Sequence, residues 1–146
     1  MESKAVDDIL ENLFRILPII HKKLLRMDLG GVAANLSRLH LAIMGILSEG
    51  SLTVTEIARV LVIPKSQMTH LIDHLVNQGI VTRHPNAKDR RVIDVSLTDH
   101  GKVMLKKCRG LVKQNIRNRL SCLTAEELVA LSDALVKIKD IGAKLE

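Results

Sequence analysis

The feature that most constrains the fold of this chain is a helical pattern that changes abruptly to an alternating one. Between Lys65 and Gly79, apolar residues recur at helical spacing on one face, and the opposite face is entirely polar. Gly79 favours the left-handed conformation that commonly ends a helix. Residues 80–83 and 92–97 then alternate as two short strands do, and residues 84–91 predict the chain reversal between them. The sequence therefore predicts a helix followed by a β-hairpin.

A second helix is predicted immediately before this one. Thr53 is placed to cap it, and Glu56, three residues later, is placed to bind the amide of the cap residue in return. Pro64 interrupts the apolar pattern but fits the first turn of the next helix. Two helices joined by a tight turn and followed by a hairpin form the outline of a winged helix-turn-helix, which favours duplex DNA as the partner.

Amphipathic helical patterns also flank this region, at residues 6–17 and 128–145. We expect residues 1–36 and 99–146 to form a helical dimerisation region. Residues 37–98 are expected to form the winged helix-turn-helix, within one continuous compact domain of mainly α (α+β) class. The flanking helices are too apolar for a small module to cover alone, which predicts a homodimer. The alternative is that these helices fold back on their own domain.

Several residues predict where the remaining helices begin or bend. Ser37 and Thr98 are placed as helix caps, and Thr124 with Glu127 forms another possible capping box. Pro18 predicts a kink or a break in the first helix.

Composition narrows the class of partner. The net charge of +6 favours a polyanion, and Phe14 is the sole aromatic residue. Surfaces that bind single strands rely on aromatic stacking, so duplex DNA is the better match. Cys108 and Cys122 have no metal-type spacing, and the chain shows no signal-peptide pattern and no apolar run of transmembrane length. We therefore expect a cytoplasmic protein with reduced thiols and no membrane association.

The segment from Asp89 to Thr98 resembles the wing signature of the multiple antibiotic resistance regulator (MarR) family. That signature is Asp, any residue, Arg, three of any kind, Val, any residue, Leu, Thr, and all five fixed positions match. The order of predicted elements is also similar along essentially the whole chain. The resemblance implies a winged-helix transcription regulator with long first, fifth and sixth helices for dimerisation. Two positions depart from it: Val62 stands where the family usually has Gly, and His70 where many members have Arg.

Six residues of the second helix are candidates for DNA contact, because the amino-terminal half of this helix enters the major groove in helix-turn-helix proteins. Gln67 has the groups for paired hydrogen bonds to adenine, and Lys65 suits a phosphate. Asp73 would be repelled by phosphates, so we expect it to pair with a nearby basic residue. An exposed helix face is polar in any case, which is the alternative for each candidate. The candidates are Lys65, Ser66, Gln67, Thr69, His70 and His74.

Five residues of the hairpin are candidates for the wing. Arg91 is suited to a narrow minor groove, and Asp89 can hold its guanidinium in a charge-assisted pair. Arg83, Lys88 and Arg90 suit phosphate contacts. A solvated salt bridge within the turn is the alternative for Asp89 and Arg91.

Other kinds of site receive less support. His70 and His74 have the spacing of two metal ligands, but no third ligand lies near them in sequence, so we predict neither a metal nor a cofactor. His21 and His40 are candidates for a small-molecule effector pocket, with ordinary packing as the alternative. No catalytic triad or phosphate-binding loop motif is present, which argues against an enzyme.

The function expected from these features is a DNA-binding transcriptional regulator. We expect a homodimeric repressor of a pseudo-palindromic operator, relieved by a possible small-molecule effector. The alternative is a winged-helix protein-interaction module without specific DNA binding.

Overall fold

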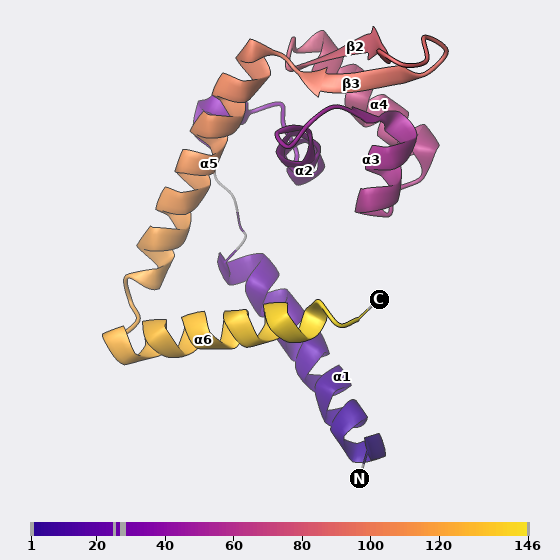
Figure 1. Ribbon diagram of the computed structural model, residues 1–146. Coiled ribbons are helices and arrows are strands. Elements are labelled where there is room, and N and C mark those ends of the chain that lie inside the picture. Colours follow the sequence, from indigo (N-terminus) through magenta and orange to yellow (C-terminus); the bar gives the residue numbers. More distant parts are fainter. Residues whose placement is uncertain (1, 25, 27–28, 146) are drawn as a thin grey trace. The chain divides into compact units, whose positions relative to one another are not determined.

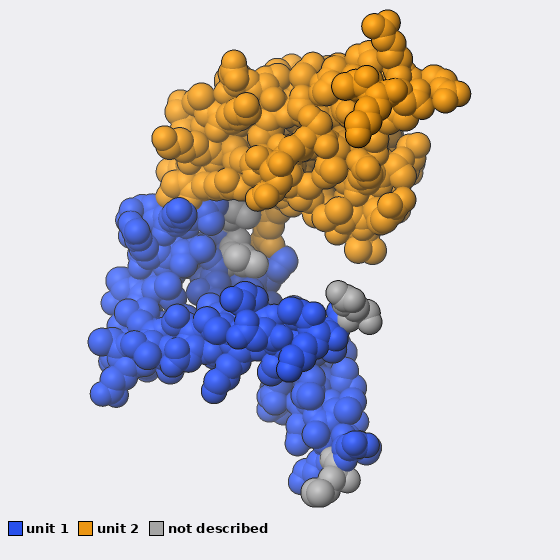
Figure 2. Space-filling view, in the orientation of Figure 1, with its two compact units in different colours: residues 1–28, 112–146 blue, residues 29–111 orange. Residues whose placement is uncertain are grey.

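The computed structural model describes residues 2–24, 26 and 29–145 of the chain. The chain divides into two compact units (Figure 2). Unit 1 comprises residues 1–28 and 112–146, and unit 2 comprises residues 29–111. Helix α5 (Asp99–Leu120) begins in unit 2 and ends in unit 1.

Unit 2 contains the predicted helix-turn-helix and hairpin (Figure 1). Its three strands form an antiparallel sheet in the order β1-β3-β2, with Leu52 opposite Val95 and Val81 opposite Leu97. The chain is mainly helical with this one small sheet, so the predicted fold class is confirmed. The elements of the unit before α5 are η2 (Gly30–Ala33), α2 (Arg38–Leu47), β1 (Leu52–Thr53), α3 (Val54–Leu61), α4 (Lys65–Asn77), β2 (Val81–Pro85) and β3 (Ile93–Leu97).

One aliphatic core holds these elements together. Each of α2, α3, α4, β2 and β3 contributes at least one fully or almost fully buried side chain, and Leu105 of α5 joins the same cluster. The packing therefore fixes α4 against the hairpin. The largest fully buried side chains are Ile43, Met44, Ile57, Met68, Ile72, Leu75, Ile80, Val95 and Cys108.

The predicted cap of α3 is confirmed. The Thr53 amide donates to Glu56 Oε2 at 2.8 Å, and the Glu56 amide donates to Thr53 Oγ1 at 3.2 Å. Gly79 ends the α4 region with φ of 69°, as its position predicted.

Thr98 caps α5 and also fixes its position. Its hydroxyl accepts from the Gly101 amide at 3.0 Å and lies 2.6 Å from the Gly79 carbonyl oxygen, to which it donates. Gly101 packs directly on the hairpin, because an added Cβ would lie 2.1 Å from the Ile80 carbonyl oxygen. The start of α5 is thus held against the base of the hairpin.

The hairpin strands differ slightly from those predicted. Strand β2 extends to Pro85, which lies opposite Ile93 and was expected in the turn. Because β2 is an edge strand, the missing amide of proline costs no hydrogen bond within the sheet. The reversal therefore begins at Asn86, whose amide donates to the Val92 carbonyl at 2.8 Å.

Val62, between α3 and α4, adopts the left-handed conformation with φ of 54° and ψ of 47°. A β-branched residue resists this conformation, yet Val62 adopts it at the position where the family usually has Gly. The Ile63 amide donates to the Ala58 carbonyl at 3.0 Å, which closes the end of α3 around Val62. The side chain of Val62 is 89% exposed. The Val62 side chain itself therefore contributes little packing that could offset the strain.

We expect Val62→Gly to stabilise the protein by about 1 kcal/mol, because glycine adopts positive φ without the clash that a β-branched residue suffers. Urea unfolding measures the change. The matched control is Val60→Gly, at an exposed position inside α3, which should destabilise by roughly 0.5 kcal/mol. If the free energy of unfolding fell equally in both variants, the strain at Val62 would be contradicted.

Unit 1 contains α1 (Glu2–Ile19), the π-helical turn η1 (Ile20–Leu24) and α6 (Ala125–Gly142). Pro18 lies in the last turn of α1, where the α-helix gives way to η1, as its position suggested. The predicted capping box of α6 is confirmed, since the Thr124 amide donates to Glu127 Oε2 at 2.9 Å.

The apolar faces of α1 and α6 are uncovered in the single chain. Neither helix has a buried residue among those described. The assignment of these helices to dimerisation stays a prediction. None of the described helices is both long and apolar enough to span a membrane. The most exposed apolar side chains of the two helices include Ile9, Phe14, Leu17, Val129, Leu135, Ile138 and Ile141.

Candidate nucleic-acid interface

Helix α4 presents a polar face to solvent because its apolar face is fixed in the core. Met68, Ile72 and Leu75 are fully buried. The hydroxyl of Thr69 donates to the Lys65 carbonyl at 3.0 Å, so its remaining capacity is as an acceptor. Five of the six candidate residues lie on the exposed face of the helix: Lys65, Ser66, Gln67, Thr69 and His70.

An ion pair joins α4 to the hairpin. Arg83 of β2 donates to the carboxylate of Asp73, so the expected pairing of Asp73 with a basic residue is confirmed. Both side chains are about a third to a half exposed. The ion pair orients Arg83 along α4, and the Asp73 carboxylate neutralises part of the charge of the Arg83 guanidinium.

Asn86 organises the tip of the hairpin, and sequence reasoning noted it only as a turn residue. Its Oδ1 accepts from the amides of Lys88 and Asp89 at 2.8 and 3.2 Å. Its Nδ2 donates to Asp94 Oδ2 at 2.8 Å. The preference of asparagine for binding the backbone two residues ahead was the available signal. The loop from residue 86 to 91 is consequently folded back on β3.

Asp89 holds Arg91 in the predicted charge-assisted pair. The distances from Arg91 Nε and Nη2 to the Asp89 carboxylate are 3.2 and 3.3 Å, and the Arg91 amide donates to Asp89 Oδ1 at 3.1 Å. These hydrogen bonds lower the pKa of Asp89 below its ordinary value. The Arg91 side chain is nevertheless 91% exposed, so its guanidinium is oriented and still open to a partner. Lys88 and Arg90 beside it are also exposed.

A surface hollow lies between α3, α4 and the hairpin. It brings Lys65 of α4 and Arg83 of β2 to one cavity, with threonine hydroxyls from two helices. This arrangement suits an anionic group such as a phosphate. The lining residues are Thr53, Val54, Thr55, Lys65, Thr69, Arg83, Val92 and Ile93.

His74 lies at the border between the polar and apolar faces of α4, and its contact with DNA stays a prediction. Its Nε2 lies 2.8 Å from the Asn35 carbonyl oxygen, and its ring packs 4.7 Å from the ring of His40. His74 lies one turn after Leu71, at the border of the apolar face, which turns it toward the body of the unit.

His40 is packed as the alternative for this residue described, and its role in an effector pocket stays a prediction. It is buried at the start of α2, where Ser37 is the cap as expected. The Ser37 amide donates to His40 Nδ1 at 2.9 Å, so Nδ1 carries no proton. Among the residues that the structure describes, His40 Nε2 has no hydrogen-bond partner. Burial lowers the pKa of His40, and the positive charge of a protonated His74 lowers it further.

His21, the other residue of the predicted effector pocket, is exposed in η1 of unit 1. Its role in effector binding stays a prediction.

We expect the protein to lose stability as the pH falls below about 6.5, because the unfolded chain then binds a proton that folded His40 does not. The stabilisation is complete above the ordinary pKa of histidine and disappears as the pH falls through the lower pKa of the folded state. His40→Gln keeps a capping-box side chain without titrating. Its free energy of unfolding should fall less between pH 7.5 and 5.5. The control His70→Gln, on the exposed face, should retain the wild-type dependence; equal slopes in all three proteins would exclude His40 as the cause.

The two cysteines differ in exposure. Cys108 is buried, which raises the pKa of its thiol, and Cys122 is exposed at the turn before α6. Among the described residues, no group of three metal-ligating side chains is close enough to hold an ion.

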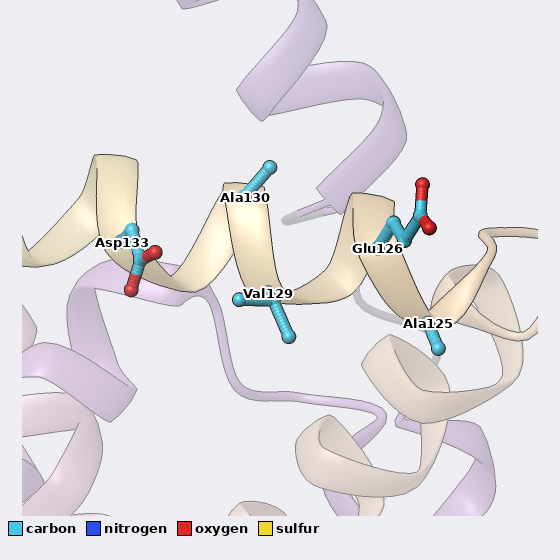
Figure 3. A pocket seen from close by; sticks show the side chains of 5 residues that line it. All are labelled: Ala125, Glu126, Val129, Ala130 and Asp133. Carbon is cyan, nitrogen blue, oxygen red and sulfur yellow. The ribbon is translucent and has the colours of Figure 1, made fainter.

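A shallow hollow on α6 is lined by residues of that helix alone. Figure 3 shows the side chains of Ala125, Glu126, Val129, Ala130 and Asp133 on successive turns. Because a single helix cannot enclose a ligand, we assign no binding role to this surface.

Comparison with known proteins gives a consistent result. The model of the MarR family matches residues 34–92. The chain is 37% identical over 89 residues to the HTH-type transcriptional repressor MdtR of Bacillus subtilis, a match that covers 61% of this chain and 57% of MdtR. It is 35% identical over 88 residues to the multiple antibiotic resistance protein MarR of Escherichia coli, covering 60% of this chain and 61% of MarR. These two matches thus span less than two thirds of each relative.

A longer match and two solved structures extend the similarity. The uncharacterised HTH-type transcriptional regulator YpoP of B. subtilis is 34% identical over 104 residues, covering 70% of this chain and 74% of YpoP. The YusO protein of B. subtilis is 28% identical with a TM-score of 0.68, covering 96% of this chain and 98% of YusO. A mutant MarR from E. coli, complexed with operator DNA, is 26% identical with a TM-score of 0.66, covering 90% and 96% of the two chains.

Proposed function

This chain belongs to the MarR family of winged-helix, DNA-binding transcriptional regulators and is not an enzyme, and from that premise we propose that it is a homodimeric repressor of a pseudo-palindromic operator. The observation that carries the proposal is the wing, where Asp89 orients a 91% exposed Arg91 at the tip of the hairpin. An arginine held in this way suits a narrow minor groove, in which the negative potential is enhanced.

The polar face of α4 supplies the base contacts in this proposal. Ser66, Gln67 and His70 enter the major groove, with Gln67 bonding an adenine. Phosphates are bound by Lys65, Lys88 and Arg90. Arg83 also binds a phosphate through the exposed portion of its side chain, because its ion pair with Asp73 does not bury it completely. Thr69 lines the same hollow as Lys65.

The uncovered apolar faces of α1 and α6 support the homodimer. Phe14 of α1 is 75% exposed and Ile138 of α6 is 57% exposed in the single chain. Exposed apolar residues in such continuous series mark an interaction surface. A two-fold pair would present two wings and two α4 helices to the two half-sites of one operator.

Regulation by an effector completes the proposal. A small molecule that changed the spacing of the two DNA-binding units would lower operator affinity, since both half-sites must be bound at once. The protein would act in the cytoplasm and would need no cofactor.

A gel shift against the duplex upstream of the protein's own gene tests the proposal. We expect a retarded complex whose affinity falls steeply between 50 and 200 mM salt, because phosphate contacts release counterions. An unrelated duplex of equal length should bind far more weakly. Absence of any salt-sensitive retention would contradict the proposal and favour a protein-interaction role.

A further inference from the structure

The positive charge of this chain is concentrated on α5. That helix contains seven of the chain's 22 basic residues and one of its 16 acidic residues, Asp99. The rest of the chain therefore has 15 of each, and α5 alone accounts for the net charge of +6. The basic residues are Lys102, Lys106, Lys107, Arg109, Lys113, Arg117 and Arg119.

Five of these residues follow one face of the helix, which we call the α5 cationic stripe: Lys102, Lys106, Arg109, Lys113 and Arg117. Their intervals of three or four residues place them above one another, because a helix has 3.6 residues per turn. From the first to the last, the stripe is about 22 Å long. All five are exposed, and among the described residues none pairs with a carboxylate.

The DNA-binding surface already described does not account for this charge. Residues 65–98 contain five basic and three acidic residues, and Arg83 and Arg91 are each paired with a carboxylate. Among the described residues, the α5 cationic stripe thus has five unpaired cations, against three in residues 65–98.

The first half of the stripe is fixed to the same unit as the wing. Thr98 binds the carbonyl of Gly79, and Gly101 packs on Ile80. Arg109 Nη2 lies 3.4 Å from Ser48 Oγ of the α2 C-cap. Lys102 and Lys106 are therefore carried by a rigid body rather than by a loose extension.

We propose that the α5 cationic stripe binds the phosphate backbone of duplex DNA outside the bases that α4 and the wing read. This inference rests on the proposed function. Duplex DNA presents one negative charge per about 1.7 Å along its axis, which matches a straight row of cations. The stripe would add affinity that is independent of sequence and would speed the search for an operator.

Other polyanions fit the helix less well. A membrane surface would need an exposed apolar face beside the cations, but Leu105 and Cys108 of α5 are buried in unit 2. Single-stranded nucleic acid would need aromatic side chains for stacking, and α5 has none.

The test compares two variants that lose the same charge. Lys106→Gln/Lys113→Gln/Arg117→Gln removes three cations of the stripe. Lys137→Gln/Lys139→Gln/Lys144→Gln removes three exposed cations from the α6 region. Binding to a long duplex of random sequence is measured by fluorescence anisotropy from 50 to 300 mM KCl. Thermal melts check that both variants fold, and the single variant Lys113→Gln provides a milder change.

The stripe variant should reduce the slope of log K against log[salt] by about 2.7 per protomer, since each lost phosphate contact removes about 0.9. Lys113→Gln should reduce it by about 0.9. The ratio of operator to random-duplex affinity should stay the same, and the α6-region control should keep the wild-type slope.

Equal slopes in the stripe variant and the control would overturn the inference and leave the proposed function intact. A second outcome would also overturn the inference. If the wild type bound anionic phosphatidylserine vesicles and the stripe variant did not, while the salt slopes for DNA were equal, the stripe would be assigned to a membrane instead. A wild-type chain that binds no duplex at any salt concentration would overturn the proposed function itself.

Discussion

Arg91→Ala is expected to lower operator affinity by at least about 30-fold. Each wing arginine should contribute about 1–3 kcal/mol, and a dimer uses two wings on one duplex. The structure supports a value in this range because Asp89 fixes the guanidinium while leaving the side chain 91% exposed. Little ordering of the side chain is therefore needed on binding. Anisotropy titration of a labelled operator at constant salt measures the change.

Two further variants separate the wing contact from general charge loss. Lys88→Ala removes an exposed neighbouring cation and should weaken binding moderately and equally on operator and unrelated duplexes. Asp89→Asn removes the charge that holds Arg91. Its loss of operator affinity should lie between those of Arg91→Ala and Lys88→Ala. Wild-type operator affinity in Arg91→Ala would contradict the role of the wing.

Leu135→Glu is expected to convert the dimer to a monomer and to reduce operator binding by about 10²–10⁴-fold, the usual gain from linking two binding modules. Leu135 is half exposed in the single chain, so a glutamate there is tolerated by the monomer. In the proposed interface, the same charge would be buried without a partner. Size-exclusion chromatography with light scattering measures the mass.

Ala130→Glu is the matched control for this prediction. Ala130 lies on the same helix and is exposed, and its distance of five residues from Leu135 places it on a different face, so its replacement should leave both the mass and operator affinity unchanged. If Leu135→Glu remained dimeric, the interface would have to lie elsewhere; if it became monomeric and bound the operator as the wild type does, two-site binding would be wrong.

Local chemistry explains why so much of unit 2 was predictable from sequence. The capping box of Thr53 and Glu56, the left-handed Gly79 and the pair of Asp89 with Arg91 each involve residues at most three apart. Such interactions depend on short spacing, which a sequence states directly. The change from helical to alternating periodicity likewise identified the hairpin before its register was known.

The errors arose where distant parts of the chain decide the outcome. The contacts of His74 with the Asn35 carbonyl, 39 residues away in sequence, and with the His40 ring could likewise not be read from local spacing. Pro85 stays in the sheet because β2 is an edge strand, a fact of strand order that periodicity does not contain. Val62 adopts a strained conformation because the closing hydrogen bonds of α3 and the packing of two helices outweigh a local preference.

A hydroxyl-radical footprint of the wild-type chain on its upstream duplex tests the central claim most directly. The account predicts two protected half-sites whose centres lie one helical turn apart, about 10 base pairs or a multiple of that. Arg91→Ala at the same concentration should lose the protection in both. Protection of a single half-site, or a periodic footprint that Arg91→Ala leaves intact, would contradict a dimer that reads DNA through α4 and the wing.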